Sequence, residues 1–192
     1  MLRITSSDWF GFQVLTPVLA EFARAQPKVV VELLTDARLY SLPQREADLA
    51  FRIRRFTEPE VVSRRLMRID YAAYLHESLE APRAGDGTGA RLITIDTAFG
   101  GMPDVAWLQR VLPNAQVASR SNNRNVQGRM CALGAGIAVL PCPLGDALPA
   151  VRRIDLGEPP PGRDTFVGYH RDLRRLARLR ALLDLVVERL AN

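Results

Sequence analysis

The spacing of apolar residues along the first third of the chain alternates between that of strands and that of helices. Residues 2–5 alternate as a short strand does, and the apolar residues after them recur at helical spacing until residues 26–27. The run 28–35 is β-branched and aliphatic, as in a strand covered on both faces. A short helix over 39–46 and a strand over 47–53 complete a β-α-β-α-β order, which predicts an open parallel sheet. The stripe of the first helix consists of Phe12, Leu15, Leu19 and Phe22.

A second series of alternating elements follows a change in composition. Two further strands are predicted over 61–69 and 71–75, and the segment 80–89 is rich in turn-forming residues. The expected elements after it are strand 91–95, helix 105–112, strand 116–119, helix 124–133, strand 137–140 and strands 151–156 and 166–170. The sequence therefore predicts an α/β fold with two αβ lobes.

The C-terminal segment is predicted to form a long amphipathic helix with Asp172 as its N-cap. Its apolar stripe consists of Leu176, Leu179, Leu183, Val186 and Leu190. Arginine is concentrated between residues 171 and 180, but a regular helix would spread these side chains around several faces. This favours a solvated helix surface over a DNA-binding one.

Composition narrows the functional classes further. The chain has 192 residues and a net charge of +5, carried by 25 arginines and a single lysine against 21 acidic residues. It shows neither a signal peptide nor a run of apolar residues long enough to span a membrane, so we expect a cytoplasmic protein. Cys131 and Cys142 are too few for a disulfide scaffold, and Cys131 lies in an apolar run typical of a buried thiol. A redox-sensing pair is the alternative.

Candidate binding residues follow the predicted strands, because ligands of open parallel sheets bind at the carboxyl ends of the strands. These positions are Ser6, Ser7 and Asp8, Thr35 and Asp36, Arg52 and Arg54, and the segments 96–101 and 120–124. Hydroxyls, backbone amides and arginines suit an anionic ligand such as a carboxylate. Asn123 is placed to cap the next helix, either beside a ligand or purely as a cap.

No catalytic or cofactor-binding motif accompanies these residues. Nucleophile, zinc and phosphate-loop motifs are absent from the sequence, and Gly134 and Gly136 come after a helix, so Gly134 is more simply a helix C-cap. Asp8, Asp36 and Asp96 could pair as catalytic carboxylates or metal ligands, but acidic residues are common at turns. We expect no enzyme activity, no cofactor and no bound metal.

Several segments in order resemble one family. They are 2–5, 15–22, 26–27, 31–33, 45–50 and 132–141. In order and spacing they resemble the effector-binding (regulatory) domain of LysR-type transcriptional regulators over nearly the whole chain. The resemblance implies two αβ subdomains joined by two crossover strands, as in type 2 periplasmic binding proteins, with a small effector held in the cleft between them. It implies subdomain I over 1–70 and 168–192 and subdomain II over 71–167.

The resemblance also implies partners and site residues. We expect a homodimer, a tetramer in the full-length protein, and an anionic or aromatic carboxylate effector that shifts the conformation of the oligomer. DNA binding would belong to an N-terminal winged helix-turn-helix outside this chain. The effector-contacting residues it implies are Ser6, Ser7, Thr35, Arg52, Thr97, Phe99, Gly100, Gly101, Asn122 and Asn123.

Two alternatives share the predicted fold. A solute-binding protein of a transport system would use the same cleft with a different partner. A small enzyme acting on an acidic metabolite would need a pair of groups with displaced pKa values, and the sequence offers no convincing pair. Trp9, Phe10 and Phe99 would favour an aromatic ligand if they line the cleft, although aromatic residues near strand ends are more often core.

Overall fold

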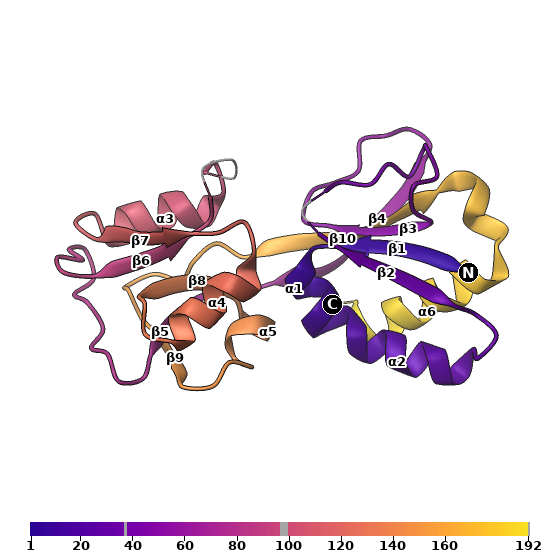
Figure 1. Cartoon of the computed structure of the whole chain (residues 1–192). Helices are drawn as coiled ribbons and strands as arrows, with labels where there is room; N and C mark the ends of the chain where they lie inside the picture. The colour runs from indigo at the N-terminus through magenta and orange to yellow at the C-terminus, as the bar shows by residue number, and fades with distance from the viewer. Residues whose placement is uncertain (37, 97–99, 192) are drawn as a thin grey trace. The chain divides into compact units, whose positions relative to one another are not determined.

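The computed structural model describes residues 1–36, 38–96 and 100–191, and the chain forms two compact units (Figure 1). The first unit comprises residues 1–68 and 163–192, and the second comprises residues 69–162. Each unit contains a five-stranded mixed sheet with helices. The predicted α/β class with two αβ subdomains joined by two crossing segments is confirmed.

The sheet of the first unit combines parallel strands with one strand from the end of the chain. Its strands are β1 (Leu2–Ser6), β2 (Val31–Thr35), β3 (Leu49–Arg52), β4 (Val61–Ile69) and β10 (Arg163–His170), in the order β2-β1-β3-β10-β4. β1 pairs in parallel with β2 and β3, and β10 is antiparallel to β3, with Phe166 opposite Arg52. β2 is an edge strand and only half-buried, so the expectation that it is covered on both faces is wrong.

The first helix contains a wide turn. It runs through α1 (Asp8–Phe10), the π-helical turn η1 (Gly11–Leu15) and α2 (Thr16–Ala25). Pro17 has no N–H to donate to a carbonyl in the preceding turn, as an α-helix requires. The wide turn comes immediately before α2, in which Pro17 is the second residue. Trp9 and Phe10 take the inward positions of the first turn, so Phe12 points outward and is 66% exposed. The predicted stripe is therefore wrong at Phe12 and correct at Phe22.

The opposite face of this sheet is covered by a loop where a helix was predicted. Residues 39–46 contain a turn in which Glu46 N–H donates to the Ser41 carbonyl at 3.0 Å. Pro43 interrupts any helical hydrogen bonding, and Arg45 has a left-handed φ of 60°. Leu42 is fully buried against Ala50, so hydrophobic packing holds the loop in place of a helix.

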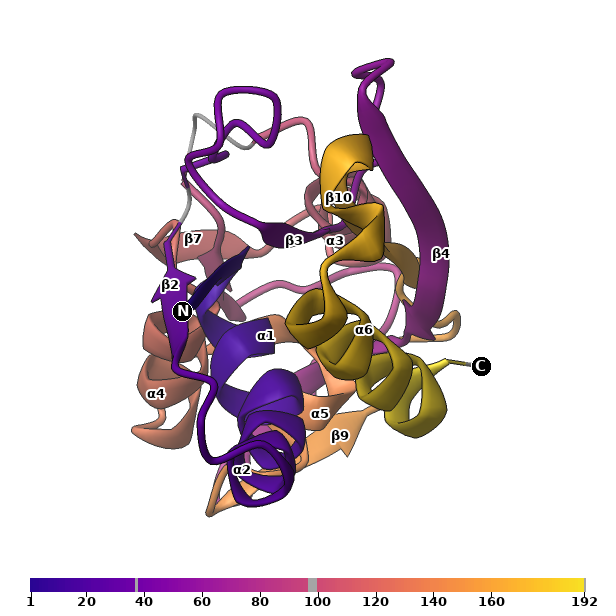
Figure 2. The ribbon, with the colours of Figure 1, turned by 90° about the vertical axis from the view of Figure 1, so that its right-hand side faces the viewer.

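The C-terminal helix lies beside α2 on the other face of the sheet (Figure 2). A 3-10 helix, η3 (Arg171–Arg175), follows β10, and α6 (Ala177–Leu190) follows η3. Leu179, Leu182 and Val186 are buried. Asp172 does not cap α6, because it lies within η3, whose N-cap is His170. Arg189 of α6 is ion-paired with Glu21 of α2 at 2.6 Å.

The second unit has a sheet of the same size. Its strands are β5 (Tyr71–His76), β6 (Arg91–Thr94), β7 (Gln116–Arg120), β8 (Ile137–Pro141) and β9 (Val151–Ile154), in the order β7-β6-β8-β5-β9. Its helices are α3 (Pro103–Val111), α4 (Arg124–Ala132) and α5 (Cys142–Gly145). β6 is parallel to both neighbours, while β5 is antiparallel to β8 and β9. The chain moves in opposite directions from β6 to β7 and from β7 to β8, so right-handed crossovers put α3 and α4 on opposite faces.

Helix α4 ends in a glycine cap, as the sequence predicts. Gly134 has φ +78°, its N–H donates to the Cys131 carbonyl at 2.9 Å, and Ala135 N–H donates to the Met130 carbonyl at 3.0 Å. These two bonds form a Schellman motif. Gly136 then passes so close to Arg91 that a Cβ there would lie 2.4 Å from the Arg91 carbonyl oxygen. The two glycines stop the helix and start β8.

One edge of the first sheet is formed by β4, whose outer half is exposed. Arg64, Arg65 and Arg68 are exposed along it, and Arg65 is ion-paired with Asp164 of β10 at 2.9 Å.

None of the helices in the described residues has the length and apolar character needed to span a membrane.

Replacement of the two glycines should have unequal effects. Gly134→Ala places a Cβ in open space at a left-handed φ and should cost about 1 kcal/mol of unfolding free energy. Gly136→Ala combines φ +153° with a backbone clash and should cost roughly 3 kcal/mol or more. Urea denaturation measures both, with Gly101→Ala, which meets no atom within 4 Å, as the control. Equal losses of unfolding free energy at Gly134 and Gly136 would contradict the close approach of Gly136 to Arg91 at the start of β8.

Candidate functional site

Two predicted site residues of the first unit lie side by side at the ends of parallel strands. Ser6 ends β1 and pairs in register with Thr35, which ends β2. Gly11, in the wide turn, approaches both side chains: a Cβ on Gly11 would lie 2.5 Å from Thr35 Cγ2 and 2.8 Å from Ser6 Oγ. Any larger residue at position 11 would have to displace these side chains, so the glycine lets the helix start close to the strand ends.

The hydroxyl groups at these strand ends differ in their partners. The Ser6 hydroxyl is buried and donates to the Ser7 carbonyl at 3.0 Å. Ser7 occupies the N-cap position of α1 but makes no side-chain capping bond. Within residues 1–36, 38–96 and 100–191, the hydroxyls of Ser7 and Thr35 have no hydrogen-bond partner. These two groups are available to a ligand.

Arg52, also predicted as a binding residue, is engaged within its own unit. Its guanidinium donates to Glu58 Oε1 at 3.2 Å and to the Tyr40 carbonyl at 2.6 Å. The same group lies 4.5 Å from the ring centroid of Phe56, and the side chain is 12% exposed. Arg52 therefore ties two loops to the end of β3.

Asp36, which follows Thr35, is turned toward the same loop. Its carboxylate accepts from the Arg38 N–H at 2.7 Å and from the Tyr40 hydroxyl at 2.8 Å. The hydrogen bond to Asp36 is the main cause of the raised pKa of Tyr40. Within the described chain, no group of three or more His, Cys, Asp or Glu residues is arranged to hold a metal ion.

Aromatic residues near the first strand end belong to the core. Trp9 and Phe10 are 4% and 2% exposed, and their rings meet edge to face with centroids 5.5 Å apart. Phe10 also contacts Phe51 of β3, at 5.7 Å. Trp9 and Phe10 are therefore core residues, the role that is more common for aromatic residues near strand ends.

In the second unit, the loop after β6 is only partly described. Thr97 and Phe99 lie outside the described residues. Gly100 and Gly101 form an exposed turn that leads into α3. A side chain at Gly101 would meet open space, so this glycine leaves the backbone accessible.

The loop between β7 and α4 carries the two predicted asparagines. Asn123 is the N-cap of α4, where its Oδ1 accepts from the Val126 N–H at 3.0 Å. The prediction that Asn123 caps this helix is thus confirmed. Asn122 is exposed, and its side-chain amide, like Nδ2 of Asn123, has no hydrogen-bond partner in the described chain. Both asparagines therefore keep donors that a ligand can use.

A buried network of charged and polar side chains lies beside this loop and is hydrogen-bonded to it. Arg124, the first residue of α4, donates to Asp104 of α3 at 2.8 Å, and both side chains are below 10% exposed. Arg124 also donates to Gln127 Oε1 at 2.9 Å and to the Val139 carbonyl at 3.1 Å. Gln127 in turn donates to the Ser121 carbonyl at 2.6 Å. The network fixes α3, α4 and β8 around the asparagine loop.

This network was missed because its charged partners are distant in sequence. Asp104 and Arg124 belong to different helices, and each occupies a first turn where polar residues are ordinary. The spacing of Arg124 and Gln127 at i and i+3 was visible, but it does not distinguish a buried pair from an exposed one. Only the tertiary structure brings the ion pair together.

The two cysteines lie near Tyr74. Cys131 is fully buried, its thiol donates to the Tyr74 carbonyl at 3.3 Å, and burial raises its pKa to about 11. Burial also raises the pKa of Cys142. The Tyr74 hydroxyl donates to Asp146 at 2.7 Å, and Asp146 is ion-paired with Arg153. A thiol of raised pKa is a poor nucleophile, and Cys131 has the packing of a small buried residue.

Comparison with known proteins identifies the family. The LysR substrate binding domain model matches residues 1–191, so the chain belongs to this family. A search of curated protein sequences gave no match. Its structure is similar to the CrgA regulatory domain of Neisseria meningitidis, a LysR-type transcriptional regulator, with a TM-score of 0.84, 20% identity and coverage of 99% of this chain and 98% of that one.

Two further structures show the same fold. The regulatory domain of MexT, a transcriptional activator in Pseudomonas aeruginosa, has a TM-score of 0.79 at 17% identity, covering 98% of this chain and 99% of that one. The CcmR regulatory domain of Synechocystis PCC6803, solved in complex with 2-PG, has a TM-score of 0.78 at 16% identity, covering 97% and 95%. The chain is thus a regulatory domain of the LysR class, and the transport-protein alternative is not supported.

The buried pair makes a testable energetic prediction. Asp104→Leu or Arg124→Met alone leaves one charge buried without its partner and should cost about 3–5 kcal/mol of unfolding free energy. The double substitution should cost clearly less than the sum of the two. Urea denaturation of all four proteins measures this coupling. Arg110→Met with Glu158→Leu, an exposed pair on the same unit, is the matched cycle and should show little coupling.

The cysteines should react at different rates. At pH 8 an aromatic disulfide reagent should modify Cys142 in the folded protein, and Cys131 only after denaturation. Because the folded pKa of Cys131 is raised, folding stability should fall as pH rises from 9 toward 11. Cys142→Ser should remove the accessible thiol. Rapid modification of Cys131 in that variant would contradict its burial.

Proposed function

We propose that this regulatory domain binds a small anionic effector through the strand-end donors of its two units. The observation that supports this most directly is a set of side-chain donors at these ends that have no hydrogen-bond partner in the described segments. They are the hydroxyls of Ser7 and Thr35 in the first unit and the side-chain amides of Asn122 and Asn123 in the second. Four neutral donors at strand ends and a loop suit carboxylate oxygens.

The remaining predicted residues take supporting positions in this proposal. Ser6 and Gly11 place Thr35 and Ser7, and Arg52 holds the loop beside them. Gly100 and Gly101 offer backbone amides next to Thr97 and Phe99, which we keep as proposed contacts. An aromatic carboxylate is the effector class we favour, with Phe99 as the proposed ring contact.

We further propose that the two compact units act as regulatory subdomains I and II. In this proposal the effector favours one conformation of the oligomer, and the population shift changes how DNA-binding domains are presented. DNA contact belongs to an N-terminal winged helix-turn-helix in the full-length protein. Such a regulator works in the bacterial cytoplasm and needs neither catalysis nor a cofactor.

A homodimer is the assembly we propose for this chain, with a tetramer for the full-length protein. Both units expose large apolar side chains that a partner could cover. Phe12 and Val30 of the first unit are 66% and 64% exposed, and Leu133 of the second is 68% exposed. Val117 and Val126, on β7 and α4, are also exposed.

A thermal-shift screen of this chain against carboxylates and aromatic acids tests the effector proposal. A ligand at about a hundred times its Kd should add roughly 2.7 kcal/mol, enough to raise Tm by several degrees. Thr35→Val and Asn122→Ala should each weaken binding of the identified ligand about tenfold, because one charge-assisted hydrogen bond is lost. Titration calorimetry gives these constants.

Thr57→Val is the matched control, because Thr57 is an exposed threonine of the first unit that is not among the proposed binding residues. It should bind the ligand as the unsubstituted chain does. Unchanged affinity in both Thr35→Val and Asn122→Ala would place the effector elsewhere. Light scattering of the same samples should give the mass of a dimer, and a monomer at every concentration would exclude the assembly proposed.

A further inference from the structure

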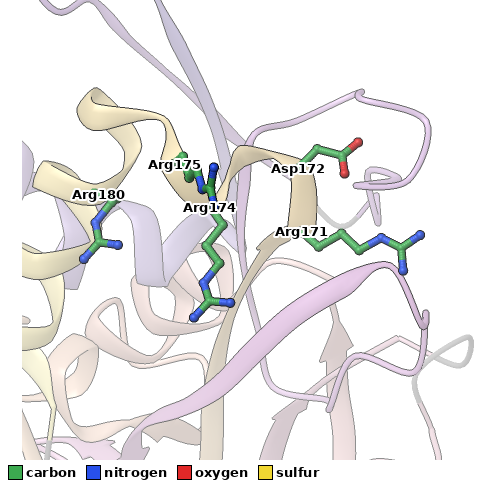
Figure 3. A pocket seen from close by; sticks show the side chains of 5 residues that line it. All are labelled: Arg171, Asp172, Arg174, Arg175 and Arg180. Atoms are coloured by element: carbon green, nitrogen blue, oxygen red, sulfur yellow. The ribbon is translucent and has the colours of Figure 1, made fainter.

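Five residues around the start of α6 line a hollow with a volume of about 560 Å³ (Figure 3). They are Arg171, Asp172, Arg174, Arg175 and Arg180. The first four belong to η3 and the last to α6. The segment is not one regular helix, because residues 171–175 form a 3-10 turn before α6. The four arginines are exposed, as expected for a solvated surface, and in Figure 3 their side chains point in different directions around the hollow.

Several backbone contacts hold this segment in place. The Arg171 N–H donates to the Glu60 carbonyl at 2.8 Å, and Nδ1 of His170 accepts from the Asp172 N–H at 3.3 Å. The Leu176 N–H donates to the Leu173 carbonyl at 2.9 Å, and Leu179 anchors α6 in the core at 1% exposed. The arginine side chains thus project from a fixed backbone.

The charges of the hollow are unbalanced. In the described part of the chain, the guanidiniums of Arg171, Arg174, Arg175 and Arg180 make no ion pair or side-chain hydrogen bond. The one acidic residue of the lining, Asp172, is already paired with Arg45 at 2.8 Å. The hollow therefore carries four positive charges that are not paired with any described residue of its own unit.

This hollow is separate from the strand-end residues of the same unit. β10 runs antiparallel to β3, so His170 lies near the start of β3, whereas Ser6 and Thr35 lie at the ends of their parallel strands. The two groups therefore lie at opposite ends of the strands of one sheet. A ligand of the hollow need not compete with one at the strand ends.

We propose that this arginine hollow binds a compact, multiply charged phosphate anion. Guanidinium groups present forked donors that match phosphate oxygens, and several of them together favour an anion of more than one charge. The volume falls within the range of small-molecule sites, roughly 300–1,000 Å³. A duplex would instead be bound by positive charges that follow its backbone over a longer surface, so a free oligophosphate fits the hollow better.

Titration calorimetry with sodium pyrophosphate at low ionic strength tests this proposal, with sodium chloride of equal ionic strength as the blank. The unsubstituted chain should bind pyrophosphate, and Arg174→Gln with Arg180→Gln should weaken binding at least about tenfold. Arg91→Gln with Arg129→Gln removes the same charge from exposed positions of the second unit and should leave the affinity nearly unchanged.

A variant that binds pyrophosphate more tightly than the unsubstituted chain cannot be explained by misfolding. Asp172→Asn removes the one negative charge of the lining and should tighten pyrophosphate binding several-fold, beyond any change in Glu80→Gln, an exposed acid elsewhere. Thr35→Val should not alter it, so failure of the strand-end proposal would leave this one standing. Equal loss in the two arginine double variants, or absence of pyrophosphate binding, would overturn the proposal. Binding of random-sequence duplex DNA without pyrophosphate binding would also overturn it.

Discussion

The pairing of β10 with β3 is the interaction on which the first unit depends. β10 comes from the end of the chain, yet it lies inside the sheet, with β4 on its other side. Phe166 and Val167 are buried there, and Gly168 admits the ring of Phe56 against the sheet. Without β10, the strand β4 would have no neighbour in this sheet. The first unit is therefore complete only after the whole second unit has been traversed.

Around this framework the structure separates residues that support a site from residues that can bind. Ser6 and Arg52 have partners within their own unit, whereas the hydroxyls of Thr35 and Ser7 have no partner among the residues that the structure describes. In the second unit the same distinction holds between Arg124, which is buried in an ion pair, and the exposed Asn122. A polar residue at a strand end is thus not sufficient evidence of ligand contact, because loops beside the strands need their own anchors.

The sequence allowed the fold to be predicted where one local pattern decides the structure. The strands of both sheets lie close to their predicted ranges because apolar β-branched runs have few alternative structures. Prediction failed at one local signal that was overlooked and at one contact between residues distant in sequence. A turn replaced the helix over 39–46 because Pro43 and the burial of Leu42 oppose a helix. The pair of Asp104 and Arg124 joins two helices, and no local pattern encodes that contact.

The exposed edge at β4 has a consequence for handling the protein. A nine-residue edge strand offers unpaired backbone groups to any other extended chain, and such edges promote aggregation. Arg64, Arg65 and Arg68 place bulky positive charge along it, so two copies brought edge to edge would repel each other. High salt screens that repulsion, so solubility should be better preserved in dilute buffer than in concentrated salt.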